Sequence, residues 1–211
     1  MKILFFGDSI TDMERNRNVA IGEYRSYGLG YPSVVASRLS ERNPVEYQVV
    51  NRGIGGNRIV DLYARIKADV WNLKPDVLSI LIGINDIWHE IHSQNGVELD
   101  RFEKFYRMII EETKQILPNI KIVLFEPFVL KGTATEEHFE EFDGIREYAK
   151  LIKKLAKEYN LPFVSLQDKF DELAKKYNNE IYLFDGVHPN IAGATLIANE
   201  WLKVFDEIVN K

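Results

Sequence analysis

The sequence predicts an α/β protein with three layers, in which helices cover both faces of a central, mainly parallel β-sheet. Short apolar runs of strand length alternate along the chain with longer segments whose apolar residues recur at helical spacing. Residues 77–82 are apolar except for Ser79, which is typical of a central parallel strand buried on both faces. No internal repeat, low-complexity tract or linker divides the 211 residues, so we expect a single domain over residues 1–211.

The elements expected in the first half of the chain begin with a buried strand at residues 2–6, an apolar run that Gly7 ends. Residues 15–30 have no clear period, and we interpret them as a loop over a ligand crevice or as an oligomer contact. A helix begins near Tyr31-Pro32, because proline is tolerated in the first helical turn. The next expected elements are a strand at 47–50, a helix at 59–70 and the strand at 77–82.

In the second half, the apolar residues of segment 99–117 form one helical stripe, and Pro118 ends the helix that they predict. The polar and acidic residues 131–143 are expected to form a surface excursion. The other expected elements are a strand at 120–125, a helix at 142–159, a strand at 162–166, a helix at 167–177 and a last helix at 191–209.

The composition excludes several classes of function. The chain has 27 Lys and Arg against 32 Asp and Glu, a net charge of −5, so it lacks the broad basic surface that nucleic acids or anionic membranes require. It has no cysteine, which excludes a disulfide scaffold, a thiolate nucleophile and a cysteine-based metal site. No stretch approaches the roughly 20 apolar residues of a membrane helix. We expect a soluble protein, most simply a cytoplasmic one.

Three of the expected strands end in turns of small residues that carry a polar side chain: Gly7-Asp8-Ser9, Gly55-Gly56-Asn57 and Gly83-Ile84-Asn85. Because parallel strands share their carboxyl end, we expect these turns at one edge of the sheet, where open α/β sheets bind ligands. Ser9 is then a candidate nucleophile if a base can reach it. The alternative is that Asp8 and Ser9 only cap the helix that follows.

Asp185 and His188 lie three residues apart, in a segment that contains Gly186 and ends at Pro189. One turn can therefore carry an imidazole together with a carboxylate that orients it. Serine acyl transfer needs a nucleophile, a base, an orienting acid and donors for the oxyanion, and the sequence contains all four kinds of group.

Four sequence blocks, in order and spread over the whole chain, resemble those of the SGNH hydrolases, the GDSL-type esterases and lipases. The resemblance implies the flavodoxin-like α/β/α fold of that family. The context of the last two blocks, including Trp88 and Pro189, looks most like bacterial acetyl-xylan esterases of this family. The blocks are Gly7-Asp8-Ser9-Ile10, Asn51-Arg52-Gly53-Ile54-Gly55-Gly56-Asn57, Gly83-Ile84-Asn85-Asp86 and Asp185-Gly186-Val187-His188.

The resemblance implies a role for each matched position. Ser9 is expected to be the nucleophile and to give its backbone N–H to the oxyanion. Gly56 is expected to supply a second backbone N–H, and Asn85 a side-chain amide. His188 is the expected general base, and Asp185 is expected to hold its tautomer. No metal or other cofactor is implied.

The expected function is hydrolysis of carboxylic esters through an acyl-enzyme, with removal of short acyl groups such as acetyl from carbohydrate esters. A lysophospholipase or thioesterase of the same family is an alternative. A second alternative is a metal-dependent phosphoesterase with Asp8, Asn85 and His188 as ligands, and a third is a catalytically silent carbohydrate-binding protein. The expected partners are a small-molecule or oligosaccharide ester and further copies of the chain, without nucleic acid or membrane.

Other residues near the blocks have simpler interpretations. Asp8 and Asp86 are expected to fix turns or cap helices. His89 and His92 are interpreted as a polar rim rather than a metal pair, because no third ligand is evident. Four apolar residues are expected either to line the acyl pocket or to belong to the core, and these are Trp88, Phe128, Phe184 and Val187.

Overall fold

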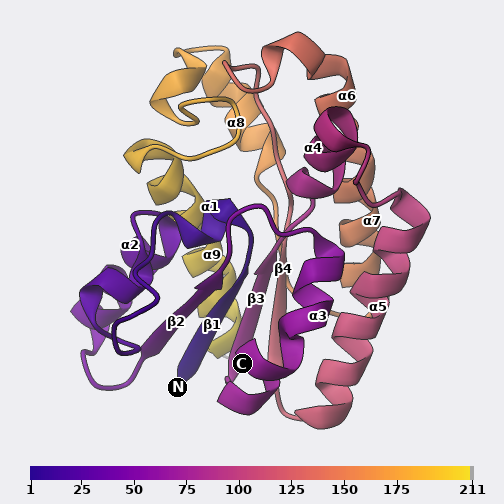
Figure 1. Ribbon diagram of the computed structural model, residues 1–211. Coiled ribbons are helices and arrows are strands. Elements are labelled where there is room, and N and C mark those ends of the chain that lie inside the picture. The colour runs from indigo at the N-terminus through magenta and orange to yellow at the C-terminus, as the bar shows by residue number, and fades with distance from the viewer. Residues whose placement is uncertain (210–211) are drawn as a thin grey trace.

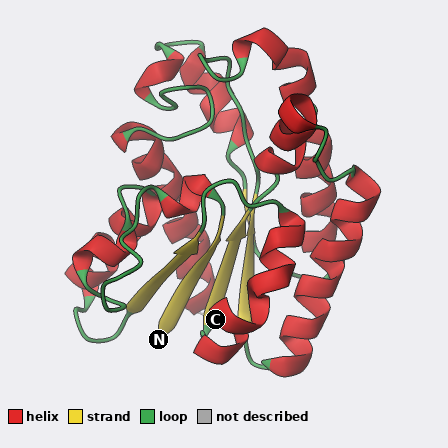
Figure 2. Ribbon diagram, in the orientation of Figure 1, coloured by secondary structure: helices red, strands yellow, loops and turns green. Residues whose placement is uncertain are grey.

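The computed structural model describes residues 1–209, which form a five-stranded parallel sheet with helices on both faces (Figures 1 and 2). The strand order is β2-β1-β3-β4-β5, so the N-terminal strand β1 lies inside the sheet. The strands are β1 (Lys2–Gly7), β2 (Gln48–Gly53), β3 (Val77–Leu81), β4 (Lys121–Phe125) and β5 (Phe163–Val164). The predicted fold class is confirmed.

The register of the sheet brings the strand ends to one level. Gly7 is the last residue of β1 and pairs with Gly53 of β2 on one side and with Leu81 of β3 on the other. The turns that follow these three strands therefore lie together at the carboxyl edge, as the sequence predicts.

Two layers of helices cover the sheet. On one face α2 (Tyr31–Arg42) packs against α9 (Ile191–Val209), and on the other lie α3 (Ile59–Asp69), α5 (Leu99–Ile116) and α7 (Ile145–Glu158) (Figure 1). The shorter helices are α1 (Ser9–Asp12), α4 (Ile84–Ser93), α6 (Phe139–Asp143) and α8 (Gln167–Ala174), with single 3₁₀ turns at η1 (Tyr24–Tyr27), η2 (Trp71–Leu73), η3 (Glu136–His138) and η4 (Asn179–Ile181). None of the helices in residues 1–209 has the length and apolar character needed to span a lipid bilayer.

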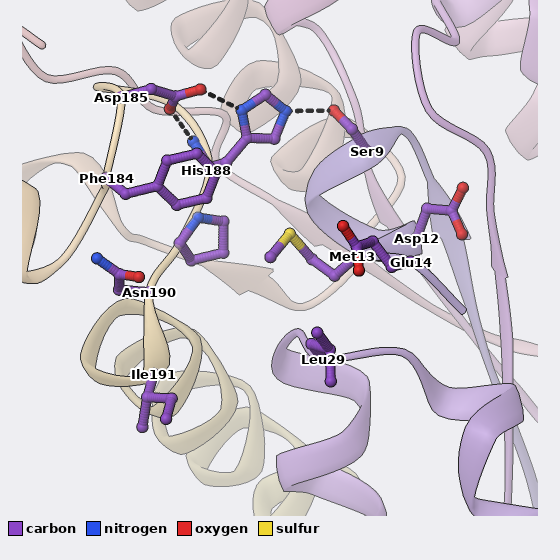
Figure 3. A pocket seen from close by; sticks show the side chains of 11 residues that line it. Ser9, Asp12, Met13, Glu14, Leu29, Phe184, Asp185, His188, Asn190 and Ile191 are labelled. Carbon is purple, nitrogen blue, oxygen red and sulfur yellow. Dashed lines mark hydrogen bonds and ion pairs between the residues drawn. The ribbon is translucent and has the colours of Figure 1, made fainter. Parts of the chain in front are cut away.

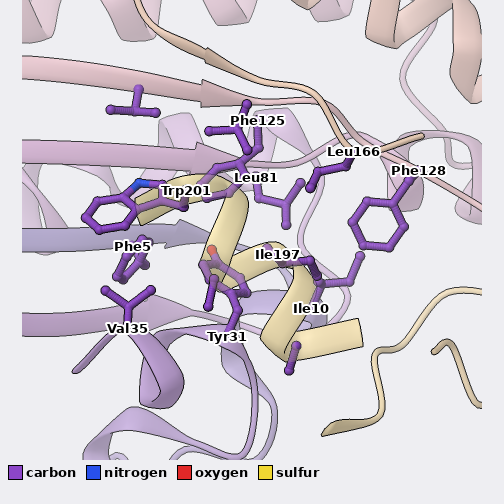
Figure 4. Close-up of a cluster of buried hydrophobic side chains, with 14 of the residues drawn as sticks. Phe5, Ile10, Tyr31, Val35, Leu81, Phe125, Phe128, Leu166, Ile197 and Trp201 are labelled. Atoms are coloured by element: carbon purple, nitrogen blue, oxygen red, sulfur yellow. The ribbon is translucent and has the colours of Figure 1, made fainter. Parts of the chain in front are cut away.

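Each face of the sheet has its own hydrophobic core, because successive residues of a strand point to opposite faces. Phe5 packs on the side of α2 and α9, where its ring centroid lies 5.2 Å from Tyr31 and 5.0 Å from Trp201 (Figure 4). Ser79 interrupts the apolar β3 strand for a definite reason, since its hydroxyl accepts a hydrogen bond of 2.9 Å from the indole N–H of Trp201.

Four expectations about the elements were wrong. Helix α4 occupies residues where the sequence indicated only a turn, and β5 has two residues instead of the expected 162–166. The segment 131–143 is not a simple surface excursion, because it contains η3 and α6 and its residues Thr135 and Phe142 are fully buried. The helix expected at 142–159 is also divided, since α6 ends and α7 begins on either side of Gly144.

Candidate active site

Ser9 stands at the carboxyl edge of the sheet as the first residue of the short helix α1. The preceding Asp8 caps this helix, because its Oδ1 accepts a hydrogen bond of 2.9 Å from the backbone N–H of Ile10. A Cβ atom at Gly7 would lie 2.4 Å from the carbonyl oxygen of Leu81, so only glycine fits between β1 and this turn. Asp8 therefore caps the helix while Ser9 remains available for chemistry.

The side chains of Asp185, His188 and Ser9 form one hydrogen-bonded chain, although Ser9 is 179 positions away from His188 (Figure 3). His188 Nε2 lies 2.8 Å from Ser9 Oγ, and His188 Nδ1 lies 2.6 Å from Asp185 Oδ2. The other carboxylate oxygen of Asp185 accepts the backbone N–H groups of Val187, at 2.9 Å, and His188, at 2.8 Å. These bonds fix the carboxylate, and the carboxylate in turn fixes the imidazole.

The electrostatics of this chain favour a charged imidazole. Burial lowers the pKa of His188, but the hydrogen bond and charge of Asp185 outweigh burial and leave the pKa above its usual value. Burial raises the pKa of Asp185, but its hydrogen bonds to His188 and to the backbone lower the pKa by more than burial raises it, so the net shift is downward. An ionised Asp185 places the imidazole proton on Nδ1 and leaves Nε2 free to accept the proton of Ser9.

The turn after β2 passes beside Ser9. A Cβ atom built on Gly55 would lie 3.9 Å from Ser9 Cβ, and Gly56 has φ +78°, a left-handed conformation that favours glycine. Asn85, the second residue of α4, is buried and donates an amide hydrogen bond of 3.1 Å to the carbonyl oxygen of Asn57. The glycine turn thus passes beside Ser9 and is bound by the Asn85 amide, whose nitrogen has a second N–H to offer.

Sequence reasoning missed the residues that hold this turn from the side of α1. Asp12 Oδ2 accepts the backbone N–H of Gly55, at 3.1 Å, and also Nη2 of Arg17, at 2.6 Å. Arg15 donates from Nε to the carbonyl oxygen of Gly53, at 2.9 Å. The only indication in the sequence is that Arg15 and Arg17 stand close together in segment 15–30, which has no periodicity.

A cavity of about 570 Å³ opens beside Ser9 and His188 (Figure 3). Phe184 forms part of its wall, and its ring stacks on that of His188 with centroids 5.7 Å apart and planes 19° apart. The cavity wall combines apolar side chains with carboxylates and an amide. Its remaining lining residues are Asp12, Met13, Glu14, Leu29, Asp185, Pro189, Asn190 and Ile191.

Two of the four expected pocket residues belong to the core instead. Phe128 and Val187 are fully buried, and the ring of Phe128 packs 4.5 Å from that of Phe170. Trp88 does lie near the site, with its ring 6.0 Å from that of His188.

The remaining polar residues near the blocks have structural partners. Asp86 Oδ1 accepts the backbone N–H of Ile59, the first residue of α3, at 3.0 Å, which confirms that Asp86 caps a helix. The rings of His92 and His138 lie 5.9 Å apart. Residues 1–209 contain no group of three or more His, Cys, Asp or Glu side chains arranged to hold a metal ion.

Comparison with known proteins gives consistent results. Residues 5–196 match the model of the GDSL-like Lipase/Acylhydrolase family. The chain is 36% identical to an acetylxylan esterase from Geobacillus stearothermophilus over 96% of its own length and 92% of the relative. The crystal structure of that esterase superposes with a TM-score of 0.85, covering 96% of this chain and 93% of the other. Variants of it described as catalytic mutants replace a serine, an aspartate or a histidine by alanine.

A structure from Parabacteroides merdae, described as a candidate GDSL-like lipase, is 38% identical and superposes with a TM-score of 0.90 over 97% of this chain and 95% of the other. These matches extend over nearly the whole chain and confirm the predicted class, a carboxylic ester hydrolase. The chain belongs to the GDSL-like lipase/acylhydrolase family.

Proposed function

We propose that this protein removes acetyl groups from carbohydrate esters through an acyl-enzyme formed on Ser9. The observation that carries the proposal is the hydrogen-bonded chain from Asp185 through His188 to Ser9, set beside a glycine turn at the mouth of a cavity. This arrangement supplies a nucleophile, a base and an orienting carboxylate within contact distance of one another.

In the first half of the reaction, Ser9 Oγ attacks the ester carbonyl while His188 Nε2 takes the hydroxyl proton. Asp185 stabilises the imidazolium that forms, in keeping with the raised pKa of His188. The oxyanion accepts hydrogen bonds from the backbone N–H groups of Ser9 and Gly56 and from the Asn85 amide, each of which is worth about 10²–10³ in turnover. His188 then protonates the departing alcohol.

In the second half, a water molecule takes the place of the alcohol. His188 removes a proton from this water, the resulting hydroxide attacks the acyl carbonyl, and the same N–H groups receive the second oxyanion. Collapse of this intermediate returns the proton to Ser9 Oγ and releases the carboxylic acid.

The cavity supports a neutral alcohol such as a sugar. Its lining includes the carboxylates of Asp12, Glu14 and Asp185, and among residues 1–209 no Lys or Arg lines it. A phosphorylated alcohol is therefore disfavoured, because its negative charge would be repelled. The exposed ring of Phe184 offers an apolar surface to a sugar ring. The acetylxylan esterase relative, similar over nearly the whole chain, supports acetyl as the acyl group.

The test is a rate series over p-nitrophenyl esters of increasing chain length, run beside acetylated xylooligosaccharides. We expect acetyl esters to react fastest, the oligosaccharides to lose acetate, and Ser9→Ala to abolish both activities without change in melting temperature. Ser37→Ala, on the exposed surface of α2, is the matched control and should retain full activity.

Three outcomes would overturn parts of the proposal. Normal turnover by Ser9→Ala would remove the nucleophile assignment. A preference for long chains would favour a lipase or lysophospholipase, and loss of activity with a chelator would favour metal-dependent phosphoester chemistry. Self-association and a cytoplasmic location stay predictions, and sedimentation in solution measures the first of them.

A further inference from the structure

Arg65 of α3 uses its guanidinium to join several segments below the site, and its side chain is only 16% exposed. Its Nη2 donates to the carbonyl oxygen of Gly7 at 3.0 Å, and its Nη1 to the carbonyl oxygen of Arg52 at 2.8 Å. Its Nε donates to Asn57 Oδ1 at 2.7 Å. Asp69, one turn further along α3, balances the charge at 2.6 Å from Nη1.

The two carbonyl groups that Arg65 binds lie at the carboxyl ends of β1 and β2, where the chain leaves the sheet for the site. Gly7 is two residues before Ser9, and its carbonyl oxygen also accepts the backbone N–H of Ile54 at 3.1 Å. The guanidinium lies over the ring of Phe6, 4.4 Å from its centroid, so the flat group is held between an aromatic face and its acceptors. Arg65 therefore fixes the nucleophile strand and the glycine turn relative to each other.

The contact with Asn57 extends this connection to the third strand. The side chain of Asn57 is held by Arg65, while its carbonyl oxygen accepts the amide of Asn85 at 3.1 Å. The orientation of the Asn85 amide thus depends on a turn that Arg65 holds in place. All three proposed oxyanion donors, on Ser9, Gly56 and Asn85, belong to segments that this one guanidinium connects directly or through Asn57.

We propose that Arg65 is a positioning residue, which sets the distance between the Ser9 nucleophile and the oxyanion donors without touching the substrate. The inference rests on the proposed function, and Arg65 is not among the residues that line the cavity. Displacement of a reacting group by about 1 Å can cost on the order of 10² in rate. A lysine at this position keeps the charge, but its single ammonium cannot reproduce the planar fork or its stacking on Phe6.

Arg52 provides a matched control, because it is the other arginine next to the same carboxylate. Its Nη1 lies 3.9 Å from Asp69, and its side chain is 26% exposed. Its side chain contacts Asp69 only at this longer distance, whereas the hydrogen bond with Arg65 uses its backbone carbonyl, which a side-chain substitution preserves. A general electrostatic or stabilising effect near Asp69 would therefore affect both arginines, whereas positioning concerns Arg65 alone.

The experiment measures kcat and KM for p-nitrophenyl acetate in Arg65→Lys, Arg52→Lys, Asn85→Ala and the double variant Arg65→Lys/Asn85→Ala, with melting temperatures for each. We expect Arg65→Lys to lower kcat by about 10–100-fold with KM changed less than about 3-fold. In the Asn85→Ala background the same substitution should cost only a few fold, because residues that act as a unit are not additive. Arg52→Lys should stay within about 2-fold of the parent.

The proposal fails if folded Arg65→Lys keeps more than half of the parent kcat. It also fails if Arg65→Lys lowers kcat by the same factor in the parent and in the Asn85→Ala background, or if Arg52→Lys lowers kcat as much as Arg65→Lys does. Should Arg65→Lys fail to fold, Asn57→Ala replaces it, since that change removes the side-chain amide that Arg65 binds and keeps the backbone carbonyl that binds Asn85. The same non-additivity with Asn85→Ala is then required. A parent enzyme that cleaves no ester would overturn the proposed function itself, whereas an active parent with unaffected variants overturns only the role of Arg65.

Discussion

The two carboxylate oxygens of Asp185 have different partners, and an amide at this position would keep one set of bonds while reversing the other. Oδ1 accepts two backbone N–H groups, from Val187 and His188, and Oδ2 contacts His188 Nδ1 at 2.6 Å. In Asp185→Asn the amide oxygen must stay on the two backbone donors, because an NH₂ group there would face them donor to donor. The NH₂ group therefore points at Nδ1, which must become an acceptor.

That change selects the wrong tautomer of His188. The ring proton moves to Nε2, which lies 2.8 Å from Ser9 Oγ, so the imidazole no longer accepts the serine proton. In serine protease triads the same substitution lowers kcat by about 10⁴, equivalent to about 5 kcal/mol of transition-state stabilisation. We expect a loss of this order, and Asp185→Ala should be no more impaired, because its imidazole can still adopt the productive tautomer.

The assay is kcat for p-nitrophenyl acetate, with thermal unfolding to show that the variant is folded. Asp206→Asn is a suitable control, since Asp206 forms a surface ion pair with Arg42 near the end of α9 opposite to Ile191, which lines the cavity, and the change should leave kcat unchanged. An Asp185→Asn enzyme within about 10-fold of the parent would refute the argument, because it would mean that the tautomer of His188 does not depend on this carboxylate.

Two further predictions concern pH and stability. His188 must be neutral to act as a base, and its pKa is raised, so kcat/KM should fall as the pH drops through a value above the usual 6.5. Asp185→Ala removes the hydrogen bond and the charge that raise this pKa and leaves burial, which lowers it, and the weaker effect of Asp8, which raises it. The acidic limb should therefore move to lower pH in this variant, and a pH-rate profile without that shift would contradict the assignment. Trp201→Phe leaves the buried Ser79 hydroxyl without its hydrogen-bond donor. We expect the free energy of unfolding, measured in urea, to fall by about 1–3 kcal/mol while kcat stays unchanged. A loss below about 0.5 kcal/mol would show that this hydrogen bond contributes little to stability.

The edge of the sheet that carries the site could be predicted because its signals are local. Each of the first three strands ends in a glycine-containing turn, the parallel arrangement places such turns at one edge, and the strand order makes these three turns neighbours. Gly7 and Gly83 confirm the point, since one has no room for a side chain and the other has φ +135°. The proximity of His188 to Ser9 followed from the family resemblance, because no local pattern relates positions so far apart in sequence.

The segment 131–143 could not be predicted, because it contacts the site mainly through its backbone. A Cβ atom at Gly132 would lie 2.4 Å from the backbone nitrogen of Gly186, and the N–H of Ala134 donates to the carbonyl oxygen of Asp185 at 3.0 Å. Backbone contacts leave little trace in hydrophobic periodicity, so an acidic, polar stretch looked like a solvated loop. In the structure it supports the turn that carries Asp185 and His188.

Asp8 shows why the turn at Ser9 needs this support from other segments. Its side chain is fully buried, burial raises its pKa to about 7, and within residues 1–209 its Oδ2 has no hydrogen-bond partner. A carboxyl group in that environment costs stability, because neither its neutral nor its charged form is fully satisfied. The bond from Oδ1 to Ile10 and the backbone bonds from Thr11 and Asp12 to the Asp8 carbonyl hold the turn only within its own segment. Arg65, which binds the preceding Gly7 carbonyl and that of Arg52, joins the turn to the neighbouring strand. The position of Ser9 is then a property of the whole carboxyl edge and not of its own short helix.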